Sequence, residues 1–510
     1  HSQLKTGHPV RSAIHKQLNG RLVLRWVTTW ESLLLYVLFS FISGLSTIWF
    51  FDAEPFVDAR ESALFRNLEL SFRETLSRWP HWAGQLRWAV DTDGLSTPYL
   101  GRPVITYGGC NDVGVDWTTV TCNTELDSMI PSREARSTTD KVWVATNLPR
   151  ELQAASKLAF SNLADFEGLP GVAVQLTAFK CGGWSVHIKL AHCLSDAQSL
   201  LSFMDAWAAQ SRKHAGTVDL KQPDPELIAK ARGLPMHRFD WWATDAPGYP
   251  DWALASSAAT MPASDVLETQ QLSPSTFPPW PTWDTALPVE HVQITFSAAE
   301  VGRMKDAARV TLPPQLSGQR ISRLDSLLSH IWMLINRARG HLSRDDNVYL
   351  DITLGLRSRL SPPLASGFVG SPLLLAHVAR SGVEASTGPI GQIGGEIRSI
   401  LTRFTPEAVS AYIHDAAYEV SPQRLWQAFL GSQHTLVTSW TQMKAYEVHF
   451  GSGTDATPQL ARYVQGVMPR MDGLVQVMDL GDGGDFDISL SLEQNAMFRL
   501  LKDPLLRVFA

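Results

Sequence analysis

Residues 184–196, WSVHIKLAHCLSD, have the pattern of an apolar strand that leads directly into a helix. Residues 172–180 form a second apolar run, and the loop 181–183 between them contains two glycines, as hairpin loops often do. Alternate positions of residues 184–190 are apolar, and His192 continues their parity. Beyond Asp196, apolar residues at three-four spacing predict a helix ending near residues 211–213, with Ser195 or Asp196 as its N-cap. We therefore expect a hairpin followed by a helix, with an imidazole at the junction.

His192 and Asp196 are the residues of this junction that can do chemistry. A histidine in an apolar surround stays neutral near pH 7, because burial disfavours the imidazolium. A neutral imidazole can accept a proton from a hydroxyl or amine, so we predict that His192 is a general base. We interpret Asp196 as a structural organiser of the loop, which caps the helix or pairs with a distant arginine. The alternative, a hydrogen-bonded core histidine beside a capping aspartate, stays open on these five residues alone.

Three further landmarks accompany this motif in a fixed order along the chain. They are LSRWPHWAGQL at residues 76–86, LRSRLSPPL at 356–364 followed by Gly370-Ser371-Pro372, and YEVHFGSG at 446–453 preceded by TSW at 438–440. With residues 179–200, this set resembles the BAHD family of acyl-CoA-dependent acyltransferases, whose two signatures are His-x-x-x-Asp and Asp-Phe-Gly-Trp-Gly. The sequence is typical of the fungal branch of that family.

The resemblance implies a fold and a reaction. The fold is α+β, with two similar chloramphenicol-acetyltransferase-like domains, each a mixed sheet with helices, and a channel between them. Acyl-CoA is the implied co-substrate, with no bound cofactor and no metal. The acceptor is the hydroxyl or amine of a small molecule, in secondary metabolism, and His192 deprotonates it for attack on the thioester. The residues implied to line the substrate and coenzyme channel are Ser439, Trp440, Phe450, Gly451, Gly453 and Arg357.

The second signature departs from the family at two positions. His449 stands where the family has Asp, and Ser452 stands where it has Trp. In the family that Asp is ion-paired with an arginine near the coenzyme channel, so we expect Arg357 or Arg359 to have another partner here. A glycine-rich surface loop is the alternative interpretation of residues 449–453.

Composition agrees with a large enzyme and excludes several classes of protein. At 510 residues, with 44% hydrophobic and 18% charged residues, the chain can bury two cores. The net charge of -6 gives no basis for a nucleic-acid or anionic-membrane partner. The four cysteines form no C-x-x-C pair and no zinc spacing, so we expect reduced thiols in a cytoplasmic protein. We also expect the protein to be a monomer. Cys193 follows His192 directly and should point to the opposite side of the strand, which disfavours a Cys-His pair.

Residues 32–51 contain no charged residue and have about the length that spans a bilayer. Serines dilute this run and Ser43-Gly44 can break it, so we favour strands over a membrane helix. Helical spacing predicts helices over residues 57–79 and 323–340. Residues 479–487 resemble a calcium loop, but glycines occupy ligand positions, and we interpret them as a turn between strands.

The predicted domain organisation has four parts. Residues 1–30 are an unplaced extension, 31–213 an N-terminal domain with the His-x-x-x-Asp motif, 214–291 a crossover rich in proline and tryptophan, and 292–510 a C-terminal domain with the altered second signature. Two other functions remain: a condensation-type catalyst that uses carrier-protein thioesters, and a non-catalytic binding protein of the same fold.

Overall fold

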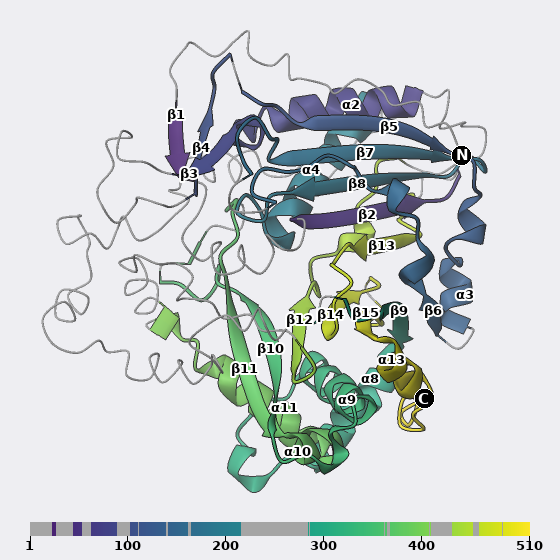
Figure 1. Cartoon of the computed structure of the whole chain (residues 1–510), viewed down its shortest axis with the longest axis vertical. Helices are drawn as coiled ribbons and strands as arrows, with labels where there is room; N and C mark the ends of the chain where they lie inside the picture. The colour runs from purple at the N-terminus through teal and green to yellow at the C-terminus, as the bar shows by residue number, and fades with distance from the viewer. Residues whose placement is uncertain are drawn as a thin grey trace, which may run out of the picture.

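The computed structural model contains two large mixed sheets and one small sheet (Figure 1). It describes residues 23–26, 44–53, 63–88, 103–110, 112–138, 141–161, 165–215, 284, 286–361, 363–364, 368–406, 408–409, 431–451, 458–481 and 483–510. The five-stranded sheet and the helix α2 (Ala63–Leu76) occupy the upper half of the view, and the seven-stranded sheet occupies the lower half with the helices α9 (Arg323–Ala338), α10 (Gly382–Thr387) and α11 (Ile390–Thr402). The predicted α+β class with mixed sheets is confirmed.

The five-stranded sheet carries the hairpin predicted from residues 172–190. Its strands, in spatial order, are β13 (Tyr463–Gly466), β2 (Leu45–Phe51), β8 (Trp184–Leu190), β7 (Val172–Phe179) and β5 (Asp116–Cys122). β7 and β8 pair antiparallel, while β5 runs parallel to β7. Two helices, α2 (Ala63–Leu76) and α4 (Ala197–His214), pack together, and Trp207 of α4 donates its indole N–H to the carbonyl of Leu68 at 2.9 Å. Their apolar faces bury aromatic side chains that hold the strand-to-helix junction in place.

The seven-stranded sheet is built mainly from the second half of the chain. Its strands, in spatial order, are β11 (Leu373–Ser381), β10 (Asn347–Gly355), β12 (His434–Ser439), β14 (Leu474–Asp479), β15 (Phe486–Glu493), β9 (Val289–Phe296) and β6 (Val142–Val144). The helices of this half are α8 (Ala298–Val310), α9 (Arg323–Ala338), α10 (Gly382–Thr387), α11 (Ile390–Thr402) and α13 (Gln494–Leu501). α9 confirms the predicted helix: Ser322 and Asp325 form a capping box at its start, and Gly340 adopts a left-handed φ of 80° just beyond its end.

The two large sheets exchange strands. β6 comes from the first half of the chain and pairs with β9, whereas β13 comes from the C-terminal region and pairs with β2. The helix α3 (Arg133–Thr138) adds a buried ion pair across the halves, between Arg136 and Asp487 at 3.1 Å. The predicted domain boundaries stay a prediction, since most of the crossover, residues 216–283, lies outside the described residues. The strand exchange means that each sheet draws on both halves of the sequence.

Several local predictions can be compared with the structure. β2 confirms a strand over Leu45–Phe51, while residues 32–43 lie outside the described part. In the described part of the chain, no helix is long and apolar enough to cross a membrane. α2 confirms residues 63–76 of the predicted helix 57–79, whereas residues 77–79 form a turn and a bend. The third sheet contains β4 (Pro103–Tyr107), β3 (Gln85–Trp88) and β1 (Val23–Trp26), so four residues of the unplaced extension form a strand. Antiparallel pairing of β14 with β15 agrees with the predicted turn between these strands, of which residues 480, 481 and 483–485 are described.

Candidate active site

His192 lies just beyond the end of β8, at the junction predicted from sequence. Its side chain is buried, with 6% of the residue exposed. The ring atom Nδ1 lies 3.0 Å from the hydroxyl of Ser371, which precedes β11 in the other half of the molecule. Burial lowers the pKa of His192 to about 4, although its own backbone carbonyl and the nearby Asp196 carboxylate oppose that effect. The imidazole is therefore neutral at physiological pH and able to accept a proton.

Asp196 is the N-cap of α4 and one half of a buried ion pair. Its Oδ1 accepts a hydrogen bond from the backbone N–H of Ser199 at 2.9 Å. The guanidinium of Arg357 contacts both carboxylate oxygens, with Nη2 at 2.8 Å from Oδ1 and Nη1 bonded to Oδ2. Arg357 follows β10, so this bidentate pair fastens the junction beside His192 to the seven-stranded sheet. The structure thus confirms that Asp196 caps the helix and that Arg357 has a carboxylate partner other than residue 449.

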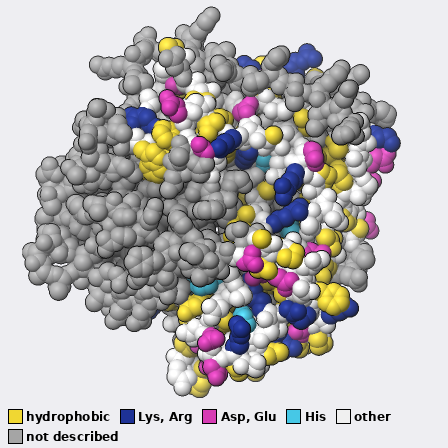
Figure 2. Space-filling view, in the orientation of Figure 1, with side chains coloured by type: hydrophobic (Ala, Val, Ile, Leu, Met, Phe, Trp, Pro, Cys, Tyr) yellow, Lys and Arg dark blue, Asp and Glu magenta, His cyan; other side chains and the backbone are white. Residues whose placement is uncertain are grey.

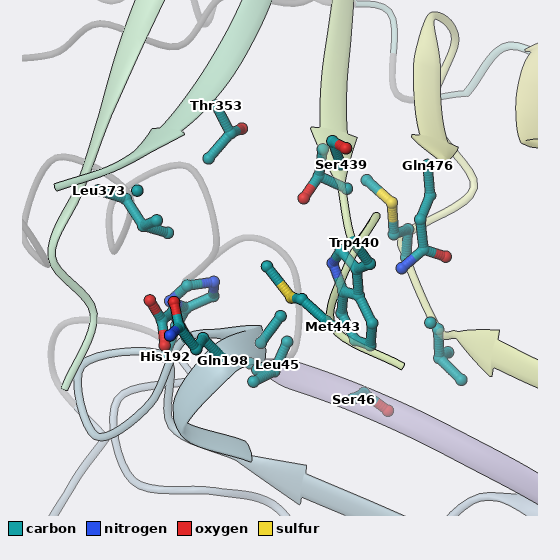
Figure 3. Close-up of a pocket in the computed structure, with 18 of the residues that line it drawn as sticks. Leu45, Ser46, His192, Gln198, Thr353, Leu373, Ser439, Trp440, Met443 and Gln476 are labelled. Carbon is teal, nitrogen blue, oxygen red and sulfur yellow. The ribbon is translucent and has the colours of Figure 1, made fainter. Parts of the chain in front are cut away.

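A cavity opens beside His192 between the two large sheets. Predicted site residues that line it are His192, Asp196, Arg357, Ser439 and Trp440. Figure 3 shows His192 and Gln198 at one end of the labelled residues and Gln476 at the other, with Met443 and Trp440 between them. Ser439 and Trp440 reach this wall because β12 ends there. The structure therefore brings five predicted residues to one cavity, from the first signature, the arginine segment and the segment that precedes the second signature.

The rest of the second signature does not line this cavity. Phe450 is buried in an aromatic cluster, with ring centroids 5.0 Å from Trp207 and 5.8 Å from Trp184. Its ring packs against the core helix α4 and strand β8, and a role for Phe450 in lining the channel stays a prediction. Gly451 follows it outside the lining residues, and Gly453 lies outside the described residues.

His449 has contacts of its own. Its Nδ1 lies 2.9 Å from the carbonyl of Glu447, and its backbone carbonyl accepts a hydrogen bond from the guanidinium of Arg212. The guanidinium beside the second signature is therefore that of Arg212. Arg359 donates instead to the carbonyls of Leu401 and Phe404, at 2.9 and 3.1 Å.

A second cavity meets His192 from another side. Residues 155–161, Lys189 and Ala191 line it together with His192. Burial lowers the pKa of Lys189 to about 8, against the attraction of Asp116, which raises it. His192 thus lies where two cavities meet, a neutral one between the sheets and one that carries lysines.

Cys193 is no candidate for a nucleophile. Burial raises the pKa of its thiol to about 12, so the thiolate is not populated at neutral pH. The predicted absence of a Cys-His pair agrees with this. Two residues that contribute to the site were missed as functional in the sequence: Ser371, which stands where many members of the resembling family have asparagine, and Gln476. A lone amide inside the apolar strand LVQVM was the available signal for Gln476.

Comparisons with known proteins agree with the fold and show the family of the chain. Residues 37–505 match the model of the Transferase family. The chain is 24% identical to Acyltransferase AFT15-1 of Alternaria alternata, in an alignment that covers 91% of each protein. It is also 24% identical to Acyltransferase abl6 of Leptosphaeria maculans, in an alignment that covers 80% of this chain and 79% of that protein. A crystal structure of F. graminearum TRI101 with coenzyme A and deoxynivalenol has a TM-score of 0.68 at 16% identity, covering 95% of this chain and 98% of that one. The chain belongs to the Transferase family, the BAHD acyltransferases. It is an acyl-CoA-dependent acyltransferase, with the coenzyme thioester as co-substrate.

Proposed function

We propose that the enzyme transfers an acyl group from acyl-CoA to a hydroxyl or amine of a small-molecule acceptor of secondary metabolism. In this reaction His192 is the general base that removes the proton of the acceptor. The observation that carries this proposal is a neutral, buried imidazole at the meeting point of two cavities. Two substrates that enter by different routes can meet only where both routes reach one side chain. A base with a lowered pKa is fully in its active, unprotonated form at pH 7.

The hydrogen bond at Nδ1 determines which nitrogen does the chemistry. We assign the ring proton to Nδ1, which lies 3.0 Å from the Ser371 hydroxyl, and the free lone pair to Nε2. Nε2 takes the proton of the acceptor, whose oxygen or nitrogen forms a bond to the thioester carbonyl carbon. The resulting tetrahedral oxyanion collapses, the C–S bond breaks, and the coenzyme thiolate takes the proton back from the imidazolium.

Asp196 and Arg357 act on the geometry of the site. Their mutual ion pair fixes the two elements that flank His192 and Ser371. Ser439 and Trp440 are our candidates for donors to the oxyanion, because they line the cavity into which His192 opens.

Ser371→Ala should lower kcat by about 10- to 100-fold, because a buried imidazole without its Nδ1 partner loses its fixed tautomer and orientation. The Michaelis constant for acyl-CoA should change little. The matched control is Ser371→Asn, which supplies the family's amide at the same place and should recover most of the rate. Steady-state release of coenzyme thiol measures both variants, and wild-type kcat in Ser371→Ala would remove Ser371 from the mechanism.

We further propose a monomer that acts in the cytoplasm. Cys110, Cys122, Cys181 and Cys193 are free thiols, which suits a reducing compartment. Lys, Arg, Asp and Glu are interspersed over the described part of the face in Figure 2, and this mixed charge does not resemble a nucleic-acid surface.

A further inference from the structure

Gln476 is buried in the wall of the neutral cavity with its carboxamide unpaired. It lies on β14, and 1% of the residue is exposed. Neither Nε2 nor Oε1 has a hydrogen-bond partner, and within the described part of the chain this is the one side chain with two such buried atoms. Buried polar groups without partners destabilise a protein, so an unpaired amide at a cavity wall requires an explanation.

The cross-strand neighbours of Gln476 on β15 and β9 have side-chain hydrogen-bond partners. Across β15, Ser489 lies beside Gln476 and contacts His291 at 2.5 Å. One strand further, Gln293 is the next residue of the same row and donates to the hydroxyl of Tyr463 at 2.5 Å. On the other side, Thr438 of β12 is the cross-strand neighbour and also lines the cavity. The side chains of Ser489 and Gln293 therefore have hydrogen-bond partners, whereas that of Gln476, which meets the cavity, has none.

The opposite wall leaves room for the carboxamide. Gly466 of β13 faces Gln476, and a Cβ atom at position 466 would overlap with Nε2 and Oε1. A glycine at this point allows the amide to lie between the two sheets. Figure 3 places Gln476 at the end of the cavity away from His192. The amide is thus positioned to contact the part of a ligand that is remote from the reacting atoms.

The charge of the cavity limits what this ligand group can be. Among the described residues of the lining, Asp196 and Arg357 are the charged ones, and each neutralises the other. Most other side chains there are apolar or carry a single hydroxyl, such as Thr353 and Ser439. A carboxylate or ammonium group would find no counter-charge, whereas a carboxamide can both donate to and accept from an uncharged group.

We propose that the Gln476 carboxamide binds a second, uncharged hydrogen-bonding group of the acceptor, a hydroxyl or a ketone, and so selects neutral acceptors that carry one. This inference rests on the proposed function of His192. We assign this cavity to the acceptor because the second cavity at His192 carries the amine of Lys189, which suits the phosphate groups of CoA better than a neutral wall does, whereas Lys157 there is paired with Asp165.

The test compares two matched alcohols, menthol and p-menthane-3,8-diol, with acetyl-CoA as donor. Wild-type enzyme should prefer the diol in kcat/KM by about tenfold or more, because one buried amide gains its partners only with the second hydroxyl. Gln476→Met, which is unbranched and of similar size, should lose that preference. It should also raise the melting temperature of the unliganded protein by roughly 2–4 °C, since two unpaired polar atoms leave the interior.

Gln175→Met is the matched control, because Gln175 is a buried strand glutamine that donates to the carbonyl of Glu151 at 2.8 Å. This variant should lower the melting temperature and keep the diol preference. The proposal is overturned if Gln476→Met lowers the melting temperature as the control does, or if the wild type shows no preference. A rise in the KM for acetyl-CoA with both alcohols would assign the amide to the pantetheine arm instead. His192→Ala tests the underlying function separately, because it should abolish transfer to both alcohols alike.

Discussion

Replacing His192 by alanine is expected to lower kcat for acyl transfer by about two to four powers of ten, the usual contribution of a positioned general base. The acceptor would then have to lose its proton to water before attack. The fold should persist, because the aromatic packing of α2 and α4 does not involve the imidazole. Release of coenzyme thiol in the presence and absence of acceptor measures the loss.

His330→Ala provides the matched control for that experiment. His330 is a buried histidine of α9 whose pKa burial also lowers to about 4, and it packs against Phe296 and Phe509. It lines neither cavity at His192. This variant should lose stability and keep its rate. A His192→Ala enzyme within a few-fold of the wild-type kcat would contradict the proposed mechanism.

Asp196→Asn is expected to destabilise the protein by about 3–5 kcal/mol, the usual effect of removing one partner of a buried ion pair. The guanidinium of Arg357 would remain buried without a carboxylate, although asparagine still caps α4. Chemical denaturation measures the change in the free energy of unfolding. Activity should fall together with stability, because the same pair holds the element beside His192.

Two further variants separate the charge from the rest of the side chain. The double variant Asp196→Asn with Arg357→Met removes both charges and should recover much of the lost stability. Glu69→Gln breaks the half-exposed pair of Glu69 with Arg73 and should cost less than about 1 kcal/mol. If Asp196→Asn abolished activity at unchanged stability, Asp196 would have a direct role in the chemistry and our assignment as an organiser would be wrong.

The elements around His192 were predictable because local patterns define them. Alternating apolar residues and a two-glycine loop gave β7 and β8, and a capping aspartate followed by a three-four stripe gave α4. The same logic gave α9, with its capping box and terminal glycine. Each of these signals lies within about 20 residues of sequence, which is the range over which periodicity can be read.

The contacts that complete the site join segments that are distant in the sequence. Ser371 meets His192 across 179 positions, and Arg357 meets Asp196 across 161. No local pattern predicts such pairs. The short strands β6 and β13, of three and four residues, lack enough length for alternation to be read, so the strand exchange was not predicted. The packing of Phe450 was likewise not predicted, because its aromatic neighbours Trp184 and Trp207 are distant from it in the sequence.

The pH dependence of kcat/KM for acyl transfer tests whether a neutral, buried His192 acts as the general base. Burial lowers the pKa of His192 to about 4, and a base is active only when unprotonated, so activity is lost as the pH falls through that value. We predict a nearly constant kcat/KM between about pH 5.5 and about pH 8, with the decline at lower pH. A half-maximal point near pH 6.5, the ordinary value for an exposed histidine, would contradict the account.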